Sequence, residues 1–585
     1  MIPAIARRLY LIIALLGMFA GLVVVRLISF QFGANVGHFT QVGETLSSVP
    51  ITLQPPRGYI HDRNGELLAS NLVQYTVGVS PSLATNPAAI ADAVNEVLGI
   101  PIADVLGAIT TKDENGNLPP YVLLARPVTT EQGQLLIAMK NDPERPSLYG
   151  LQVEPFDRRA YPGGQLAAHV LGFTNLDNVG NFGVEGFYDE LLAGHPISTL
   201  RPVIPFDVAL NPEPDYGAHL YLTIDREIQY MTEQALRDAV ERYGAERGTI
   251  IIMDPRTGEI LAMASIPTYD PNRYAEIAAN LPANAPPTEI PFFNPAISEQ
   301  FEPGSGFKVL TMAAALQSGI VTPQSTYYDN GALEIGGIVI RNWNNSAWGT
   351  QDMTGLLAHS LNVGAATLSV TMGPDVFYSY MTAFGFGQPT NIDLAGEARG
   401  RLKRPGDPDW NDSDLATNSF GQGVAVTPIQ LITAISAVAN RGAMMQPHLL
   451  YLVNDRTSYH TTQPQVLGRP ISAEVALTLS EMLAVSLESE SSNALVPGYR
   501  IAGKTGTAEI PTQFGYSDET VASFIGWGPV DDPRFIVLVK LDKPDAIWGS
   551  ATAAPTFAEI VRRLVILMEI PPDNIRISMN GQGSN

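Results

Sequence analysis

The chain has 585 residues, of which 45% are hydrophobic and 16% charged, a balance typical of folded proteins and a length that predicts two or three domains. It carries 35 Lys and Arg against 58 Asp and Glu, so the formal net charge is −23, which argues against a nucleic-acid-binding surface, because such surfaces need clustered basic residues. The sequence contains no cysteine, which excludes disulfides, thiolate metal sites, a cysteine nucleophile and a lipid-modified N-terminal cysteine.

An apolar segment near the N-terminus has the length of a membrane-spanning helix. Residues 9–28 carry no charge apart from Arg26, and at about 1.5 Å per residue such a helix approaches the roughly 30 Å hydrocarbon core of a bilayer. Arg7 and Arg8 favour a cytoplasmic N-terminus. A cleaved signal peptide is the alternative, but the apolar segment is longer than the usual hydrophobic region of a signal peptide and no small-residue cleavage site follows closely. We therefore predict a cytoplasmic tail (1–8), a retained anchor (9–28) and an extracytoplasmic remainder.

The region from residue 29 to residue 216 alternates short β-like runs with turn residues. The sequence Asp-Arg-Asn-Gly at 62–65 predicts a tight turn between two strands. Apolar residues at helical spacing predict a helix over 88–98. We see no nucleophile beside a base in this region, and we interpret it as a non-catalytic spacer.

From residue 217 the pattern changes to longer apolar elements. A short strand at 220–225 leads into a helix, and residues 248–265 predict two strands joined by a turn at 254–258. A hairpin packed against helices, with later strands, predicts a mixed α/β or α+β domain, which we place at 217–570.

The end of the chain predicts one more helix and a tail. Residues 555–568 have the pattern of an amphipathic helix with Arg562 and Arg563 facing outward. We expect this helix to close the domain. Residues 571–585 have no such pattern, and we expect them to form a flexible tail.

Ser305 and Lys308 form the most informative local pattern. They follow a Pro-Gly pair at the head of an apolar run. Residues i and i+3 share one face of a helix, so the hydroxyl and the amine can meet. A lysine folded into a core is desolvated, which lowers its pKa and lets the neutral amine accept the serine proton. The pair can therefore serve acyl transfer, whereas the structural alternative is a capping serine with an exposed lysine.

Two later motifs favour the catalytic interpretation. Ser360-Leu361-Asn362 precedes a predicted helix and offers a hydroxyl that can relay a proton and an amide that can bind a peptide carbonyl. Lys504-Thr505-Gly506-Thr507 has the pattern of an edge strand bordering a cleft. There Gly506 would let a substrate backbone approach, Lys504 supplies charge and the threonines supply hydroxyls. The order S-x-x-K, S-x-N, K-T-G is the motif set of penicillin-binding proteins and β-lactamases.

With these motifs the chain resembles the class B penicillin-binding proteins, which are membrane-anchored D,D-transpeptidases of peptidoglycan synthesis. The resemblance covers nearly the whole chain, and its segments lie at 56–69, 158–173, 183–194, 222–229, 301–308, 419–431, 503–509 and 521–529. It implies an α+β fold with an N-terminal transmembrane helix, an elongated and mostly β pedestal (dimerisation) domain at 29–216, and a transpeptidase domain with a central antiparallel sheet flanked by helices. Gly306 departs from the family pattern, because the position after the nucleophile more often carries a small or β-branched side chain.

The resemblance also implies a role for each motif residue. Ser305 would attack the penultimate D-Ala carbonyl of a stem pentapeptide, with Lys308 as general base and Ser360 as proton relay. The backbone N–H groups of Ser305 and Thr507 would form the oxyanion hole. Asn362 would hold the donor peptide. The side chains that would receive its terminal carboxylate are those of Lys504, Thr505 and Thr507.

The partners follow from the same resemblance. The substrates would be peptidoglycan stem peptides and a lipid-linked precursor, β-lactam antibiotics would acylate Ser305, and no cofactor or metal is expected. The sequence has no metal-binding HExxH motif and no P-loop. Since no glycosyltransferase domain is recognisable, polymerisation would come from a polytopic glycosyltransferase of the shape, elongation, division and sporulation (SEDS) class that contacts the cytoplasmic-membrane anchor and pedestal.

Three other functions use related sequences. A serine β-lactamase shares the three motifs but would need neither a long pedestal nor an anchor. A β-lactam-sensing receptor would carry several transmembrane helices and a cytoplasmic effector, and a non-catalytic scaffold would not need the complete motif set. We interpret the conspicuous side chains His359, Glu302, Trp343 and Trp348 as structural rather than catalytic, with the two tryptophans in a loop that borders the cleft.

Overall fold

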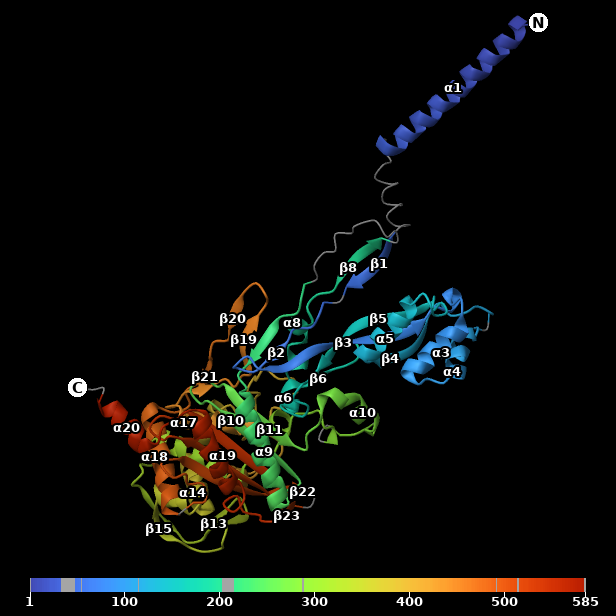
Figure 1. Ribbon diagram of the computed structural model, residues 1–585. Coiled ribbons are helices and arrows are strands. Elements are labelled where there is room, and N and C mark those ends of the chain that lie inside the picture. Colours follow the sequence, from blue (N-terminus) through green and yellow to red (C-terminus); the bar gives the residue numbers. More distant parts are fainter. Residues whose placement is uncertain are drawn as a thin grey trace. The chain divides into compact units, whose positions relative to one another are not determined.

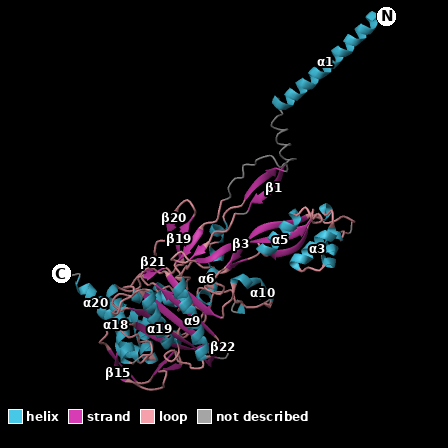
Figure 2. Cartoon of the chain, in the orientation of Figure 1, coloured by secondary structure: helices cyan, strands magenta, loops and turns pink. Residues whose placement is uncertain are grey.

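The computed structural model describes two units of the chain (Figures 1 and 2). One unit comprises Met1–Pro56 and Gly194–Gly217, and the other comprises Arg57–Ala193 and Ala218–Asn585. The described residues are 2–32, 48–53, 55–113, 115–202, 215–282, 284–286, 289–490, 492–512 and 515–582.

The first unit contains the predicted apolar helix. Helix α1 spans Ile2–Phe32, and within it Arg7–Ser29 has a mean hydropathy of 2.7 over its most apolar stretch. Among the described residues this is the one helix long and apolar enough to cross a membrane. Strand β1 (Ser48–Leu53) pairs antiparallel with β8 (Ile197–Pro202). The prediction of an N-terminal apolar helix is confirmed.

The second unit contains a seven-stranded sheet in the order β20-β19-β9-β2-β3-β4, with β5 also paired to β3. Its strands, in chain order, are β2 (Ile60–His61), β3 (Leu67–Val79), β4 (Val122–Val128), β5 (Leu151–Ala160), β9 (His219–Leu222), β19 (Leu450–Asn454) and β20 (Tyr459–Thr461). The predicted tight turn lies between β2 and β3, which pair antiparallel. The sheet thus joins strands from both sides of the boundary that we predict at residue 216.

Short helices pack against one end of this sheet. Helices α3 (Pro87–Leu98), α4 (Ile102–Thr110) and α5 (Thr130–Asn141) bury their apolar faces against β3, β4 and β5 in a core of their own. The predicted helix over 88–98 corresponds to α3. The remaining short elements of the region are η1 (Pro81–Leu83), α6 (Ala168–Leu171), β6 (Phe173–Thr174), β7 (Gly180–Asn181), α7 (Gly183–Phe187) and α8 (Asp189–Ala193).

A buried ion network holds three segments of this region together. The carboxylate of Glu185 accepts hydrogen bonds from Arg57 Nε at 2.7 Å and Arg159 Nε at 2.5 Å, and the side chains of all three residues are at most 1% exposed. Arg57 also pairs with Asp189 at 2.6 Å. Burial alone would raise the pKa of Glu185, but the two guanidinium groups outweigh it and hold the pKa below its usual value.

The site is built on a second sheet, which has five antiparallel strands in the order β11-β10-β24-β23-β22. Its strands are β10 (Arg247–Met253), β11 (Ile260–Ile266), β22 (Ala502–Thr512), β23 (Gly515–Gly528) and β24 (Phe535–Asp542). Every residue of β24 is buried, because alternate side chains enter the separate cores on the two faces of the sheet. Strand β22 lies at the edge, as predicted for the Lys-Thr-Gly segment.

Helices cover both faces of this sheet. Helices α9 (Arg226–Tyr243) and α19 (Ala553–Leu567) pack on one face, and the other face is covered by a helical layer. That layer and its neighbours comprise α10 (Tyr274–Ala279), α11 (Pro295–Ser298), α12 (Lys308–Gln317), α13 (Met353–Ala358), α14 (Asn362–Met372), α15 (Pro374–Ala383), α16 (Asp412–Asn418), α17 (Pro428–Ala439) and α18 (Ala473–Ser489). The predicted α+β class with a central antiparallel sheet flanked by helices is confirmed.

Short strands and turns complete this part of the chain. They are η2 (Pro271–Arg273), η4 (Gly304–Phe307), β12 (Thr326–Asp329), β13 (Ala332–Ile335), β14 (Ile338–Arg341), β15 (Gly349–Asp352), β16 (Arg401–Leu402), β17 (Val424–Ala425), β18 (Met444–Met445) and β21 (Val466–Gly468). Several of these strands form two-stranded sheets, as β12 does with β15 and β13 with β14. Strands β12, β13 and β14 contact α14, and β15 contacts α13.

The C-terminal segment differs from the prediction. Asp573–Gln582 form helix α20 rather than a flexible tail. Arg576 in this helix is 9% exposed and pairs with Asp531 and with Asp573, so the helix is tied to the loop before β24. The final residues, 583–585, lie outside the described part of the chain.

Removing the Glu185 carboxylate leaves two buried guanidinium groups without their shared counter-ion. We expect Glu185→Ala to lower the free energy of unfolding by about 3–5 kcal/mol, seen as a lower urea midpoint for the full chain in detergent. Glu190→Ala is the matched control, because Glu190 is exposed five residues later and such changes cost less than about 0.5 kcal/mol. Equal midpoints for the two variants would contradict the prediction.

Candidate active site

Ser305 and Lys308 lie where the chain turns into a buried helix. Ser305 is in the single turn η4, and Lys308 begins α12. Lys308 Nζ lies 3.0 Å from Ser305 Oγ, so the three-residue spacing brings the hydroxyl and the amine together as predicted. Ser305 is partly exposed, whereas Lys308 is only 1% exposed. The structural alternative, an exposed lysine beside a capping serine, is therefore wrong.

The amine of Lys308 is surrounded by oxygen atoms from the second motif. Its Nζ donates to the Ser360 backbone carbonyl at 2.6 Å and to Asn362 Oδ1 at 2.7 Å, and it lies 3.3 Å from Ser360 Oγ. None of these atoms carries a full negative charge. Burial therefore dominates and holds the pKa of Lys308 well below its usual value, and the positive charge of Lys504 lowers it further.

Ser360 occupies an unusual backbone conformation in the turn between α13 and α14. Its φ is 54°, in the left-handed region that costs a non-glycine residue about 1–3 kcal/mol. Flanking contacts hold the turn: Trp343 Nε1 donates to the His359 carbonyl at 3.1 Å, and Asn362 Nδ2 donates to the Arg341 carbonyl at 3.1 Å. The strained conformation directs both the carbonyl and the hydroxyl of Ser360 towards the lysines.

The third motif lies on edge strand β22. Lys504 Nζ donates to Ser360 Oγ at 3.0 Å and lies 3.3 Å from Thr505 Oγ1. Thr507 Oγ1 accepts a hydrogen bond from the Gly549 N–H at 3.1 Å. Burial lowers the pKa of Lys504 to about 8, although the negative charge of Glu490 opposes this shift. Ser360 Oγ thus lies between two lysine amines.

Two glycines allow η4, the turn of the candidate nucleophile Ser305 (the nucleophile turn), to approach β22. Gly304 has a φ of +54°, and a Cβ there would lie 2.5 Å from the Thr507 carbonyl oxygen. A Cβ on Gly506 would lie 2.3 Å from Ser523 Oγ and 2.8 Å from the Pro303 carbonyl oxygen. Gly506 is therefore required for packing beneath the nucleophile turn, and its predicted contact with a substrate backbone remains a prediction.

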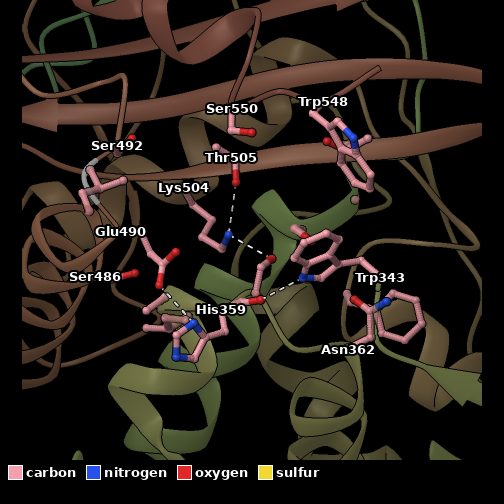
Figure 3. Close-up of a pocket in the computed structure, with 18 of the residues that line it drawn as sticks. Trp343, His359, Asn362, Ser486, Glu490, Ser492, Lys504, Thr505, Trp548 and Ser550 are labelled. Atoms are coloured by element: carbon pink, nitrogen blue, oxygen red, sulfur yellow. Dashed lines mark hydrogen bonds and ion pairs between the residues drawn. The ribbon is translucent and has the colours of Figure 1, made fainter. Parts of the chain in front are cut away.

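Six of the eight predicted site residues line one cavity of about 500 Å³ (Figure 3). These are Ser305, Ser360, Asn362, Lys504, Thr505 and Thr507. The two other predicted residues, Lys308 and Gly506, are buried and do not line the cavity. In the described part of the chain no group of three or more His, Asp or Glu side chains could hold a metal ion.

The cavity wall also contains residues that the motifs do not include. Trp343 and Trp548 meet edge to face with ring centroids 5.4 Å apart, and both line the cavity. His359 lines it too, with its Nδ1 3.0 Å from Glu490 Oε1 and its side chain half-buried. Trp343 and Trp348 border the cleft as predicted, but nothing in the sequence near residue 490 indicates a cavity residue.

Glu302 has the structural role that we predict for it. Its carboxylate accepts hydrogen bonds from the Gly423 N–H at 3.0 Å and from the Tyr516 hydroxyl at 3.1 Å. Burial raises the pKa of Glu302, and these hydrogen bonds oppose that shift. Glu302 therefore connects the nucleophile turn to the loop before β17 and to the β22–β23 hairpin.

Two family models match the chain. The transpeptidase domain of penicillin-binding proteins matches residues 248–562. The penicillin-binding protein dimerisation domain matches residues 52–199. The first match alone covers more than half of the chain and contains all three motifs.

Curated relatives match over most of their length. Stage V sporulation protein D of Bacillus subtilis is 31% identical over 92% of this chain and 84% of its own. Peptidoglycan D,D-transpeptidase FtsI of Escherichia coli K12 is also 31% identical, over 88% of this chain and 84% of its own.

Solved structures share the fold. Penicillin-binding protein 3 of Mycobacterium tuberculosis complexed with aztreonam has a TM-score of 0.68 and 26% identity, covering 89% of this chain and 98% of that one. A peptidoglycan synthetase from Bifidobacterium adolescentis has a TM-score of 0.70 and 27% identity, covering 90% and 98%.

The structure has room for a side chain at Gly306, the residue that departs from the family pattern. A Cβ at Gly306 would meet no atom within 4 Å, and alanine restricts the unfolded chain more than glycine does. We expect Gly306→Ala to raise the free energy of unfolding by about 0.4–1 kcal/mol, measured by urea denaturation. Gly304→Ala is the contrasting variant, because its Cβ would collide with the Thr507 carbonyl, and it should destabilise. A loss of stability in Gly306→Ala would contradict the prediction.

The positive charge of Lys504 is the second cause, after burial, of the lowered pKa of Lys308. Removing that charge in Lys504→Gln should raise the pKa of Lys308, so the neutral amine should appear only at higher pH. We expect the rate of Ser305 acylation by p-nitrophenyl acetate, followed as a burst of p-nitrophenol, to rise at a higher pH than in the wild type.

The control for this experiment is Lys543→Gln. Lys543 pairs with Glu246 and Glu519 and does not line the cavity. Its removal should therefore not change the pH at which the rate of the p-nitrophenol burst rises. The same inflection in Lys504→Gln and the wild type would show that the charge of Lys504 does not act on Lys308.

Proposed function

The chain belongs to the class B penicillin-binding proteins, and from this premise we propose that Ser305 is the nucleophile with which it cross-links peptidoglycan. The reaction is D,D-transpeptidation: a stem peptide is transferred to the enzyme with release of its terminal D-Ala, and then to an amine of a neighbouring stem peptide. The observation that carries the assignment is the 3.0 Å contact between Ser305 Oγ and the desolvated amine of Lys308.

Lys308 acts as the general base. A neutral amine has two N–H donors and one lone pair, whereas an ammonium has three donors and no lone pair. The Ser360 carbonyl and Asn362 Oδ1 can only accept, and they lie at the two shortest distances, 2.6 and 2.7 Å. These two contacts use both N–H groups of the neutral amine, which leaves its lone pair for the Ser305 hydroxyl.

Acylation then proceeds at the mouth of the cavity. Ser305 Oγ forms a bond to the penultimate D-Ala carbonyl carbon while its proton passes to Lys308 Nζ. The C–N bond to the terminal D-Ala breaks, and the leaving amine takes a proton through Ser360 Oγ, which lies within 3.3 Å of both lysines. A positioned base of this kind contributes about 10²–10⁴-fold to the rate.

The remaining motif residues bind the oxyanion and the donor peptide with its terminal carboxylate. The backbone N–H groups of Ser305 and Thr507 form the oxyanion hole, where the loss of one donor typically costs about 2.7–4 kcal/mol. Lys504, Thr505 and Thr507 receive the carboxylate of the terminal D-Ala. Asn362 holds the donor peptide. Asn362, Thr505 and Thr507 are partly exposed on the cavity wall, which supports binding from solvent.

The apolar helix α1 makes this a single-pass membrane protein, and we extend the proposal to its orientation. Arg7 and Arg8 at the start of the helix favour a cytoplasmic N-terminus, which leaves the catalytic region on the extracytoplasmic side, where stem peptides are cross-linked. A polytopic SEDS-type glycosyltransferase that contacts the anchor and the pedestal region at 29–216 would supply the glycan strands.

The nucleophile assignment is tested with a fluorescent penicillin, because a β-lactam acylates the same serine. Ser305→Ala should abolish covalent labelling of the full chain in detergent, measured by gel fluorescence and by the mass of the adduct. Ser318→Ala is the matched control, since Ser318 lies just beyond the end of the same helix α12 and should label like the wild type.

Two outcomes would overturn the assignment. Undiminished labelling of Ser305→Ala would place the nucleophile elsewhere. Rapid loss of the penicilloyl adduct from the wild type, with release of hydrolysed penicillin, would identify a β-lactam hydrolase instead of a transpeptidase.

A further inference from the structure

The active-site cavity contains one carboxylate, which none of the three motifs includes. Among the residues that line it, Glu490 is the sole acidic side chain, facing a site that otherwise contains lysines, hydroxyls and aromatic rings. Its side chain is 48% exposed. Its negative charge acts on Lys504, so Glu490 influences the electrostatics of the site in which Ser305 reacts.

His359 and its neighbours fix the position of this carboxylate. Glu490 Oε1 lies 3.0 Å from His359 Nδ1, and the His359 ring stacks on Trp348 with centroids 4.1 Å apart and an interplanar angle of 21°. Figure 3 shows the Glu490 carboxylate turned towards His359 within the cavity. The other oxygen, Oε2, makes no hydrogen bond with the described residues, so it can accept one from a ligand.

The position of Glu490 on the fold also favours a cation. Glu490 directly follows helix α18, and Ser486 and Leu487 of the last turn line the cavity as well. The carboxyl end of a helix carries a partial negative charge that stabilises cations. The carboxylate and the helix end therefore act in the same direction, at one end of a cavity in which Lys504 provides the opposite charge.

The two substrates of a transpeptidase carry opposite charges where they enter this site. The donor presents a terminal carboxylate, which suits Lys504, whereas the acceptor presents an amine that is an ammonium in water. We propose that Glu490 recognises the ammonium of the acceptor peptide and thereby directs the acyl group of Ser305 to an amine rather than to water. This inference rests on the proposed function.

The transfer step then balances as follows. The ammonium bound at Glu490 releases one proton to water, and the neutral amine nitrogen forms a bond to the acyl carbonyl carbon. The bond between that carbon and Ser305 Oγ breaks. The second proton lost by the nitrogen passes through Lys308 to Ser305 Oγ, so that the hydroxyl and the neutral lysine are restored. Glu490 is a specificity residue in this scheme and forms no covalent bond.

The test measures how one acyl-enzyme divides between acceptors. The full chain in detergent is acylated with an N-benzoyl-D-alanyl thioester in the presence of Nα-acetyl-lysinamide, whose single charge is its ammonium, or of methanol, which is uncharged.

In Glu490→Gln the ratio of amide product to hydrolysis product should fall about three- to tenfold, because one charge interaction with the acceptor is lost. The ratio of methyl ester to hydrolysis product should not change. Both products in each ratio come from the same acyl-enzyme in the same sample, so the ratio does not depend on the fraction of protein that is folded.

Glu488→Gln is the matched control. Glu488 lies two residues earlier in α18, pairs with Arg500 at 2.9 Å and does not line the cavity, so its loss should change neither ratio. An equal fall for both acceptors in Glu490→Gln would show that Glu490 acts only through His359 and the shape of the wall. An unchanged amide ratio would show that Glu490 does not contact the acceptor.

Failure of the proposed function gives a different result. If the wild type forms no acyl-enzyme on Ser305 with the thioester, detected by mass, the transpeptidase assignment and the role of Glu490 are both overturned. If the acyl-enzyme forms but Glu490→Gln has the same ratio of amide product to hydrolysis product as the wild type, the role of Glu490 alone is overturned.

Discussion

The burial of one lysine amine is the constraint on which the site depends. Its Nζ contacts Ser305, the carbonyl of Ser360 and Asn362 at the start of α14, with no carboxylate of the described residues in contact to stabilise the charge of Lys308. In water this amine would be protonated and useless as a base. Burial without a counter-ion in contact lowers the pKa of this amine, which supports the base role proposed for it. The strained turn at Ser360 is part of the same arrangement, since it brings a carbonyl, rather than a carboxylate, to the amine.

Much of this arrangement could be predicted from local sequence patterns. The three-residue spacing of Ser305 and Lys308, the hairpin of β10 and β11 and the edge position of β22 all follow from short-range rules of helix and strand geometry. The motif order then brings Ser360 and Lys504 to the same site, although their contacts arise from tertiary packing. The left-handed backbone of Ser360 could not be predicted, because no glycine or asparagine marks it.

The features that sequence reasoning missed depend on residues far apart in the chain. No sequence motif near Glu490 predicts that it lines a cavity. It reaches the cavity because α18 packs beside α13. The helix α20 was missed because its apolar side chains are mostly exposed, whereas its Arg576 pairs with Asp531, which is distant in sequence. Gly506 was interpreted through the substrate, whereas its nearest atoms belong to Ser523 and Pro303.

The seven-stranded sheet has a consequence for the modularity of the chain. Strand β2 precedes the pedestal helices in sequence, yet it pairs in parallel with β9, and β9 pairs with β19, which comes after Ser305. The hydrogen bonds of one sheet therefore cross the domain limit that the sequence indicates. A fragment that begins after residue 216 would keep β9 and β19 but lose β2, which would leave an open strand edge available to other molecules. In this chain the region that contains Ser305 therefore shares a sheet with a strand that precedes residue 216.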